Sequence, residues 1–356
     1  MTSKPIVGFA GFLVALCGIG ALIAPRPTLA DAVPPSDLPP ALRELLSKQF
    51  KFSPSELMDL EREKVVARRL GGSAAGEVGT AGAVRVRARK QTFVDLYRNI
   101  VEFKRGPEVV SIGLFGDPPS VSDLASLVLD KQDVNLRNCR VGECDIRLPA
   151  ATIGRFQREI EWTAPDADAR AAALYKQILA DNVRAYMSGG AGRMTEYDDE
   201  KRPVHPVDDF AGLLKNSPFL DDLVPGLSRH LAAFPSSRLH DDDDFVYWSK
   251  EKFGDLAPFV TVTHVTIAHP GAGTAVIASR DVYSSRYFNA SLSVTIASDA
   301  LAAPDAFYLV YVNRSRADAL KGAFAGLRRS LVERRAKSSV EDNLKLTKRR
   351  LEKSTR

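Results

Sequence analysis

The sequence predicts an α+β fold, in which an antiparallel sheet packs on a long C-terminal helix, with additional helices N-terminal to the sheet and inserted within it. Three observations predict this fold. Residues 259–269 (FVTVTHVTIAH) carry β-branched side chains at almost every second position, which is the period of a strand. Residues 270–273 (PGAG) then form a break typical of a hairpin turn. Residues 307–313 (FYLVYVN) read as a further strand, and a helical pattern follows directly.

Two more strands are expected between the hairpin turn and residue 307. The first covers residues 274–282. In the second, residues 289–298, apolar and polar side chains alternate, with Ala290, Leu292, Val294 and Ile296 on one side. This alternation predicts an antiparallel strand with one buried face and one face in water.

The final helix is predicted from an apolar stripe. Leu320, Phe324, Leu327 and Leu331 recur at intervals of four, three and four residues, so they share one face of a helix. Asp318 stands near its start, where an acidic side chain suits the helix dipole. A sheet followed by such a helix implies that the helix lies across the sheet.

This succession of four antiparallel strands and a long C-terminal helix resembles the helix-grip fold of START-like and Bet v 1-like proteins. The resemblance lies in the order of the elements over about a third of the chain, and no signature motif supports it. It implies a curved sheet wrapped around the helix, with an apolar cavity between the two.

Several elements are expected upstream. Ser53-Pro54-Ser55-Glu56 predicts a capping box that starts a helix running to Leu70. Gly71–Gly82 reads as a flexible linker, Val84–Arg89 as an edge strand and Val109–Phe115 as a buried strand. Further helices are expected at residues 41–50, 92–103, 122–129, 151–162, 166–187 and, as short pieces, 208–234, and a short strand is expected at 193–198.

The predicted organisation has four parts. Residues 1–30 read as a signal peptide, because Lys4 precedes an apolar run and small residues stand at positions 28 and 30, where a signal peptidase reads them. Residues 31–82 form an N-terminal leader and helical arm, 83–336 an α+β domain with a helical insertion around 199–250, and 337–356 a basic tail. The protein is therefore expected to be exported, periplasmic or extracellular; the alternative is an uncleaved N-terminal membrane anchor.

Removal of the signal peptide leaves two cysteines, Cys139 and Cys144. In an exported protein such a close pair around a turn predicts a disulfide. The spacing is not that of a thioredoxin-like pair, and two cysteines alone make a poor zinc site.

Positive charge is concentrated at the C-terminus. Residues 328–356 contain 11 Lys or Arg and 4 Asp or Glu, a balance of +7, whereas the whole chain carries +5, so residues 1–327 sum to −2. The tail is interpreted either as a contact with an anionic membrane surface or as a solvated helix end. Nucleic acid is not an expected partner, because the body is not basic.

No motif assigns a catalytic residue, a metal or a cofactor. Residues 240–244 (HDDDD) have no EF-hand spacing and read as an exposed acidic loop. Residues 226–230 (GLSRH) lack the final glycine of a nucleophile elbow. No P-loop or H-E-x-x-H motif is present.

Five polar residues within the strands are candidate ligand contacts: His264, Arg280, Tyr283, Arg286 and Tyr287. His264 stands among valines, and Arg280 shares a strand face with apolar side chains. If this face lines a cavity, these residues would be its polar anchors. The alternative is a histidine with satisfied hydrogen bonds in the sheet and an exposed arginine. A second polar cluster to consider is residues 196–199 (EYDD).

Three functions follow. The first is an exported protein that binds an apolar or lipid-like small molecule between sheet and C-terminal helix. The second is a structural or envelope-associated protein without a ligand. The third is an enzyme on the same scaffold that uses His264, Arg280 or a nearby tyrosine in acid–base catalysis.

Overall fold

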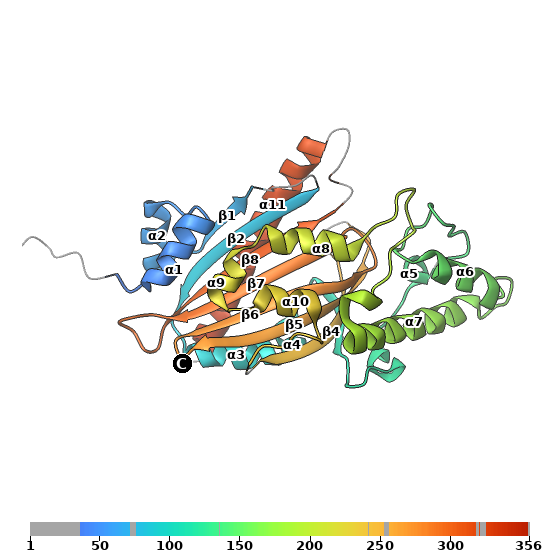
Figure 1. Ribbon diagram of the computed structural model, residues 1–356, viewed down its shortest axis with the longest axis horizontal. Helices are drawn as coiled ribbons and strands as arrows, with labels where there is room; N and C mark the ends of the chain where they lie inside the picture. Colours follow the sequence, from blue (N-terminus) through green and yellow to red (C-terminus); the bar gives the residue numbers. More distant parts are fainter. Residues whose placement is uncertain are drawn as a thin grey trace, which may run out of the picture. The chain divides into compact units, whose positions relative to one another are not determined.

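An eight-stranded antiparallel sheet is the framework of the protein (Figure 1). The computed structural model describes residues 36–71, 76–134, 136–240, 242–252, 256–317, 320 and 325–354. The strands are β1 (Val66–Leu70), β2 (Glu77–Val86), β3 (Val109–Leu114), β4 (Asp243–Glu251), β5 (Phe259–Gly271), β6 (Thr274–Ser284), β7 (Ala290–Asp299) and β8 (Phe307–Arg316), in the order β1-β2-β8-β7-β6-β5-β4-β3. The predicted fold class is therefore confirmed. The predicted signal peptide lies outside the described residues.

The four strands predicted around the hairpin are confirmed. β5 and β6 are joined at Gly271 and Thr274, and β7 and β8 continue the antiparallel series. Helices cover both faces of this sheet. For this reason β5 is buried on both faces from Phe259 to Ala268, and the predicted wet face of β7 is only half-exposed at Ser291 and Ser293.

One face of the sheet, called the α11 face below, packs against α3 (Lys90–Arg98), α4 (Ile100–Phe103) and the long helix α11 (Ala325–Ser354). In Figure 1 these helices lie behind the sheet. Burial of Val84, Ile277 and Leu309 from the strands against Phe93 and Leu344 from the helices removes apolar surface from water and holds the layers together.

The C-terminal helix packs on the sheet, but through a later stretch than predicted. Val340, Leu344 and Leu351 are buried, whereas Leu331 is 46% exposed. Leu320 is buried ahead of the helix, and Phe324 lies outside the described residues.

A glycine in β2 explains why α11 packs on the sheet at Val340 and Leu344. A Cβ atom on Gly82 would come within 2.6 Å of Val340 Cγ1 and 2.8 Å of Leu344 Cδ1, so the glycine permits the helix to approach the strand at this level. The predicted boundary at residue 336 thus falls inside one continuous helix.

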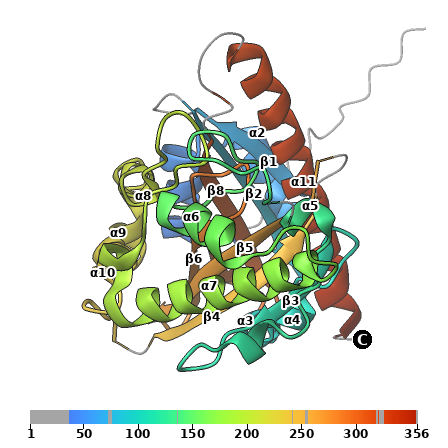
Figure 2. The same ribbon diagram turned by 90° about the vertical axis from the view of Figure 1, so that its right-hand side faces the viewer.

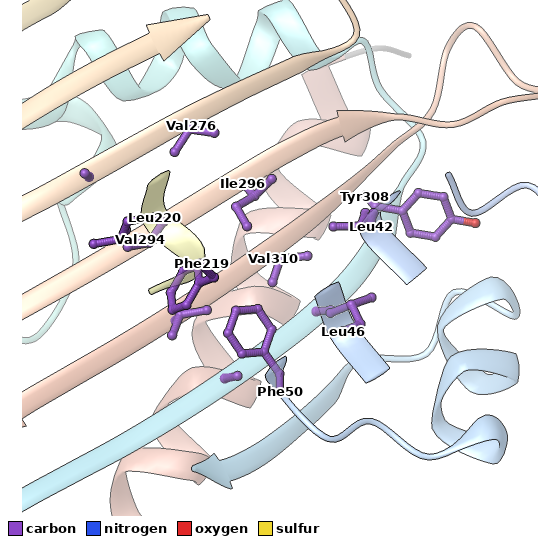
Figure 3. Packing of buried hydrophobic residues seen from close by; sticks show 14 of the residues in the cluster. Leu42, Leu46, Phe50, Phe219, Leu220, Val276, Val294, Ile296, Tyr308 and Val310 are labelled. Carbon is purple, nitrogen blue, oxygen red and sulfur yellow. The ribbon is translucent and has the colours of Figure 1, made fainter. Parts of the chain in front are cut away.

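The opposite face, called the α8 face below, carries α1 (Pro40–Glu44), the π-helical turn η1 (Leu45–Gln49), α2 (Pro54–Glu61), α8 (Pro206–Lys215), α9 (Phe219–Leu223) and α10 (Leu227–Ala233). Figure 3 shows Phe50 and Phe219 meeting over Ile296 and Val310. Their ring centroids are 5.1 Å apart in an edge-on arrangement, which aromatic pairs favour.

Two longer helices, α6 (Ala150–Glu159) and α7 (Ala167–Gly189), cover the β4–β6 end of this face, as Figure 2 shows for α7 and β4. Short helical segments complete the described chain: η2 (Val121–Leu124), α5 (Lys131–Val134) and η3 (Gly190–Arg193). Residues 193–198 do not form a strand; Tyr197 makes a single bridge with Val204.

The N-terminal region differs most from the prediction. The capping box at Ser53 and Glu56 is confirmed, but its helix ends at Glu61, and residues 66–70 form β1. The linker expected at Gly71–Gly82 contains most of β2. The edge strand expected at Val84–Arg89 is also wrong, because β2 includes its first residues and lies between β1 and β8. Small residues such as Gly79 and Gly82 suggested flexibility, whereas they permit close packing on both faces of the strand. β3 is an edge strand and not a buried one, with Val110 54% exposed.

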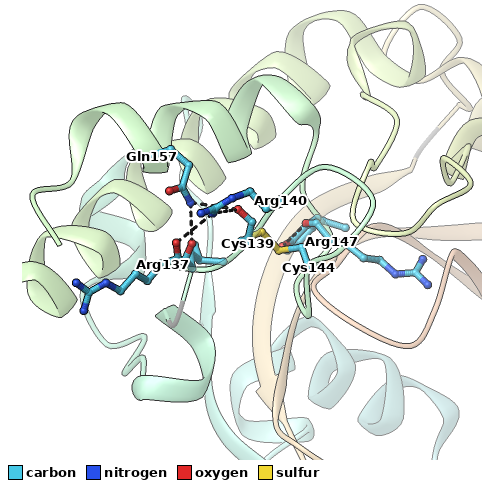
Figure 4. The surroundings of a disulfide bond; sticks show 8 residues. Arg137, Cys139, Arg140, Cys144, Arg147 and Gln157 are labelled. Atoms are coloured by element: carbon cyan, nitrogen blue, oxygen red, sulfur yellow. Dashed lines mark hydrogen bonds between the residues drawn. A yellow bond between two sulfur atoms is a disulfide. The ribbon is translucent and has the colours of Figure 1, made fainter.

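The predicted disulfide between Cys139 and Cys144 is confirmed, with the Cα atoms 4.6 Å apart. Figure 4 shows how the loop is fixed: Gln157 of α6 donates hydrogen bonds to the carbonyl oxygens of Leu136 at 3.0 Å and Cys139 at 3.2 Å. A disulfide indicates a non-cytoplasmic location. Among the described residues, no helix has the length and apolar character needed to cross a bilayer.

Candidate functional site

His264 and Arg280, two of the five predicted contacts, are brought together by the sheet. They are direct partners across β5 and β6, and both side chains lie on the α8 face. His264 is 0% exposed and Arg280 1%. The prediction of an exposed arginine as the alternative is therefore wrong, because α8 and α10 cover this part of the face.

His264 belongs to a buried group that we call the histidine cluster: His230 of α10, Asp244 of β4 and His264 of β5. Both Nε2 atoms point at the same carboxylate oxygen, Asp244 Oδ1, at 3.1 Å from His230 and 2.9 Å from His264. Thr266 donates its hydroxyl to that oxygen at 2.7 Å. The Nδ1 atoms of both histidines also have hydrogen-bond partners. His230 Nδ1 lies 2.9 Å from the carbonyl oxygen of Ser237, and His264 Nδ1 lies 2.8 Å from Tyr186 Oη.

The surroundings of the histidine cluster shift the pKa values of its two imidazoles in opposite directions. Burial opposes a charge on His230, but the hydrogen bond and charge of Asp244 outweigh it and raise the pKa of His230. Burial lowers the pKa of His264 and prevails over the same carboxylate. Burial would raise the pKa of Asp244, yet the hydrogen bonds from the two histidines lower it. The cluster therefore places the Asp244 carboxylate between two imidazoles whose pKa values are shifted in opposite directions, upward for His230 and downward for His264.

Arg280 is a buried cation that makes no ion pair with the described residues. It donates to the carbonyl oxygen of Leu231 at 2.8 Å, and its guanidinium lies 4.1 Å from the ring centroid of Phe210. Its Nε atom has no hydrogen-bond partner in the part of the chain that the structure describes. Burial accordingly lowers the pKa of Arg280.

The other three predicted contacts lie farther along the sheet and do not join His264. Tyr283 donates to the carbonyl oxygen of Arg147 at 3.1 Å and meets Tyr175 Oη at 3.1 Å. It lines a small pocket with Tyr175 and Tyr197 that has space for about one water molecule. Tyr287 donates to the carbonyl oxygen of Ala257, and the side chain of Arg286 is half-buried.

A second polar region lies on the α11 face, where the sequence predicts an apolar cavity and none of the following residues as a ligand contact. We call it the polar strip: Thr263, Ser279, Asp281, Ser291, Ser293, Tyr311 and Asn313, from β5 to β8. Its hydroxyl and amide groups are linked across strands. Ser293 Oγ lies 3.0 Å from Tyr311 Oη, and Asn313 donates to Ser291 at 3.2 Å and to Ser293 at 3.0 Å. The alternation of serines along β7 was the available signal, but it was interpreted as a surface in water.

Asp281 is the charged member of the polar strip. It is half-buried and accepts one hydrogen bond from a described residue, from Thr263 at 3.0 Å. Burial raises its pKa to about 7, because this single hydrogen bond offsets little of the desolvation. Nearby, Lys104, which follows α4 directly, forms an ion pair with Glu251 at 2.5 Å and donates to Tyr247 Oη at 3.3 Å.

The two remaining charged motifs have different outcomes. In residues 196–199, Asp198 accepts a hydrogen bond from the backbone N–H of Ala150, and Asp199 is buried with a pKa raised by burial to about 6. In the basic helix α11, Lys348 donates to the carbonyl oxygen of Arg85 and Arg350 pairs with Glu102, so part of its charge acts within the fold. The membrane interpretation of the tail stays a prediction.

The prediction of an exposed acidic loop at residues 240–244 is wrong for Asp244. Asp243 and Asp244 open β4, so their side chains point to opposite faces. Asp243 pairs with Arg98 near the surface at 2.7 Å, while Asp244 turns into the histidine cluster. Strand alternation from Val246 and Trp248 back to Asp244 would have indicated this. No local signal pointed to His230, because tertiary packing of α10 brings it in.

Comparison of the chain with protein-family models, with curated proteins and with solved structures finds no match.

Proposed function

We propose that this protein is an exported binding protein that holds a small molecule on the polar strip of the α11 face. The observation that carries the proposal is Asp281: a half-buried carboxyl group with one protein hydrogen bond in the described structure and a pKa raised to about 7. A buried or half-buried polar group normally has its hydrogen bonds satisfied, so spare capacity in a group of titratable side chains favours a ligand.

The lining favours a particular class of ligand. Serine, tyrosine and asparagine side chains offer donors and acceptors, and Asp281 offers an acceptor. A small molecule with hydroxyl or amino groups matches this lining. The entirely apolar ligand expected from the sequence would leave these polar groups without new partners.

The position of the strip supports the same proposal. It shares its sheet face with α4 and α11, which is where the helix-grip resemblance placed a ligand. The disulfide fits an exported protein.

The first experiment identifies what the protein carries. The full chain would be produced in an exporting host, and molecules released on denaturation would be identified by mass spectrometry. We expect a hydroxyl- or amine-bearing compound from the wild type and less of it from Asp281→Asn. Asp299→Asn is the matched control, because Asp299 lies on β7 at the far end from the strip and pairs with Lys90. Extracts equal to the blank, or equal retention by Asp281→Asn, would contradict the proposal.

A second experiment uses defined compounds. Saturation-transfer NMR with glucose, glycerol and putrescine would be recorded at pH 6 and pH 8 on wild type and Asp281→Asn. Because Asp281 ionises near pH 7, binding of the cationic amine should strengthen at pH 8 in the wild type only. A hydroxyl ligand should show little pH dependence.

Catalysis on the same strip is the second candidate function. A carboxyl group with a pKa near 7 is suited to general acid–base work at neutral pH. Chemical change of a bound compound during the NMR experiment, lost in Asp281→Asn, would favour an enzyme.

A further inference from the structure

The histidine cluster joins three elements that are far apart in sequence. His230 comes from α10, Asp244 from the start of β4 and His264 from the middle of β5. One ligand atom from each residue can be chosen so that all three lie within 4.8 Å of one another. Ligand atoms around a zinc ion at about 2.1 Å are roughly 3.4 Å apart. The Nε2 atoms of His230 and His264 lie 3.1 and 2.9 Å from Asp244 Oδ1, slightly closer than that, and no separation in the set exceeds 4.8 Å, which is about 1.4 Å more than in a zinc site. Small side-chain movements would therefore bring the three ligand atoms to zinc-binding distances.

We propose that His230, Asp244 and His264 form a binding site for a divalent first-row transition metal, with Zn²⁺ as the representative ion. The ligand atoms are Nε2 of both histidines and the carboxylate of Asp244. The site lies on the α8 face, apart from the polar strip, and its existence does not depend on the proposed small-molecule ligand.

The outer hydrogen bonds of both imidazoles already have the arrangement that metal sites use. His230 Nδ1 faces the carbonyl oxygen of Ser237 at 2.9 Å, so Nδ1 carries the proton and the opposite nitrogen faces inward. His264 Nδ1 faces the hydroxyl oxygen of Tyr186 at 2.8 Å, which can accept a hydrogen bond from an Nδ1–H group. A metal-bound histidine almost always donates its other N–H to such an oxygen, which fixes the ring and its tautomer.

An unused oxygen provides the independent sign of a ligand. Asp244 Oδ2 is buried and accepts no hydrogen bond from the described residues. The guanidinium Nη1 of Arg238 lies 3.7 Å from it, and the Arg238 side chain is 59% exposed. A buried carboxylate oxygen is normally satisfied by a donor or a cation, so this oxygen is available to an ion. Arg238 lies on the exposed side of the cluster, so a metal ion would compete with its guanidinium for Asp244 Oδ2.

The donor set decides the class of metal. Two imidazole nitrogens and one carboxylate suit zinc, iron(II) and related ions, whereas calcium and magnesium prefer oxygen ligands alone. The hydroxyl oxygen of Thr266 is the next donor, 3.1 Å from His230 Nε2. The competing interpretation is a metal-free network, in which both imidazoles and Thr266 donate to Asp244 Oδ1. The two interpretations differ in whether the protein takes up metal stoichiometrically.

The test is equilibrium metal binding by the full chain, expressed without a polyhistidine tag. Isothermal titration with ZnCl₂ should give one ion per chain, and CoCl₂ should produce visible ligand-field bands. Asp244→Asn and His264→Gln should lose the stoichiometric site, with at least a tenfold lower affinity. His205→Gln is the control, because His205 forms a surface pair with Glu196 at 2.8 Å and should bind as the wild type does.

Two milder variants keep the test decisive if the buried substitutions disturb folding. Tyr186→Phe leaves the ring packed but removes the oxygen beside His264 Nδ1, and should lower zinc affinity about tenfold. Arg238→Gln removes the competing cation from the surface and should raise it. A wild type that binds no zinc beyond the background overturns the proposal. The proposal is also overturned if Asp244→Asn, Tyr186→Phe and Arg238→Gln all bind zinc with the affinity of the wild type.

Discussion

His264 on β5 lies directly opposite Arg280 on β6, and both side chains are buried on the same face of the sheet although each can carry a positive charge. Their surroundings differ. His264 has the carboxylate of Asp244 at 2.9 Å, whereas Arg280 has a backbone carbonyl oxygen and the face of Phe210. One cross-strand pair therefore places a histidine whose pKa is lowered by burial beside a buried arginine that pairs with no carboxylate among the described residues.

Replacement of Arg280 by methionine tests the energetic role of this cation. Methionine keeps much of the side-chain volume and removes a charge whose burial is costly. We expect Arg280→Met to be destabilised by no more than about 1 kcal/mol, or to be more stable than the wild type, in urea unfolding.

The control for that experiment is Arg314→Met. Arg314 pairs at 2.8 Å with Glu77, which is fully buried, so its loss leaves a buried carboxylate with one partner fewer. We expect a loss of about 3 kcal/mol or more there. Equal losses in the two variants would show that Arg280 stabilises the fold like an ordinary paired arginine.

The strands from residue 259 onward were predictable because their period-two pattern is strong and a Pro-Gly turn separates the first two. The final helix was predictable as an element, but its packing was not. Leu331 and Leu344 both fit helical stripes in the sequence, whereas the close approach of Val340 and Leu344 to Gly82 of β2 is a tertiary contact that the helical pattern does not reveal. The same glycine made β2 resemble a linker.

The candidate sites show a similar limit. His264 and Arg280 were recognisable as polar residues in an apolar strand, which is a local signal. His230 and the buried role of Asp244 depend on how α10 packs over β4, which involves residues 14 positions apart joined through tertiary contacts. The polar strip was missed because serines on a strand face look the same in sequence whether they meet water or a covered surface.

Asp281 makes the stability of the protein depend on pH. Its pKa is raised to about 7, above that of an unfolded aspartate near 4, so the folded state holds the proton more tightly. This contribution is fully present below about pH 4 and is lost as the pH rises through 7. We expect the free energy of unfolding to fall by roughly 2–4 kcal/mol over this window.

Asp281→Asn should lack this part of the pH dependence. Urea unfolding at half-unit steps from pH 4 to 8 would measure it, with the difference between wild type and variant as the readout. Asp199, whose pKa is raised to about 6, contributes in the same direction to both proteins and cancels. A constant difference across the whole range would mean that Asp281 is ionised throughout.

The Cys139–Cys144 disulfide should stabilise the fold modestly. It closes a short loop, since the cysteines are five positions apart, so the chain-entropy gain is about 2 kcal/mol. The double variant Cys139→Ser/Cys144→Ser should lose this amount in chemical unfolding. Dithiothreitol should lower the stability of the wild type to a similar degree and leave the double variant unchanged; a response of the double variant to the reductant would point to another effect.

Docking of α11 on β2 can be tested at Gly82. An added Cβ would meet Val340 Cγ1 at 2.6 Å, and neither a central strand nor a packed helix can move freely. We expect Gly82→Ala to cost about 1–3 kcal/mol in urea unfolding. Gly71→Ala should be within about 0.5 kcal/mol of the wild type, because no atom lies within 4 Å of the Cβ that it would add.

A double-mutant cycle with Val340→Ala makes this prediction specific to the helix. Removing the valine methyl groups opens the space that the new Cβ needs, so the double variant should be more stable than the sum of the single losses by at least about 0.5 kcal/mol. Leu346→Ala supplies the control on the outer side of the same helix, since Leu346 is 52% exposed, and should combine additively with Gly82→Ala. Additivity with Val340→Ala as well would mean that α11 does not pack on β2 through this residue. The α11 face, including the polar strip, would then be more open than the structure shows.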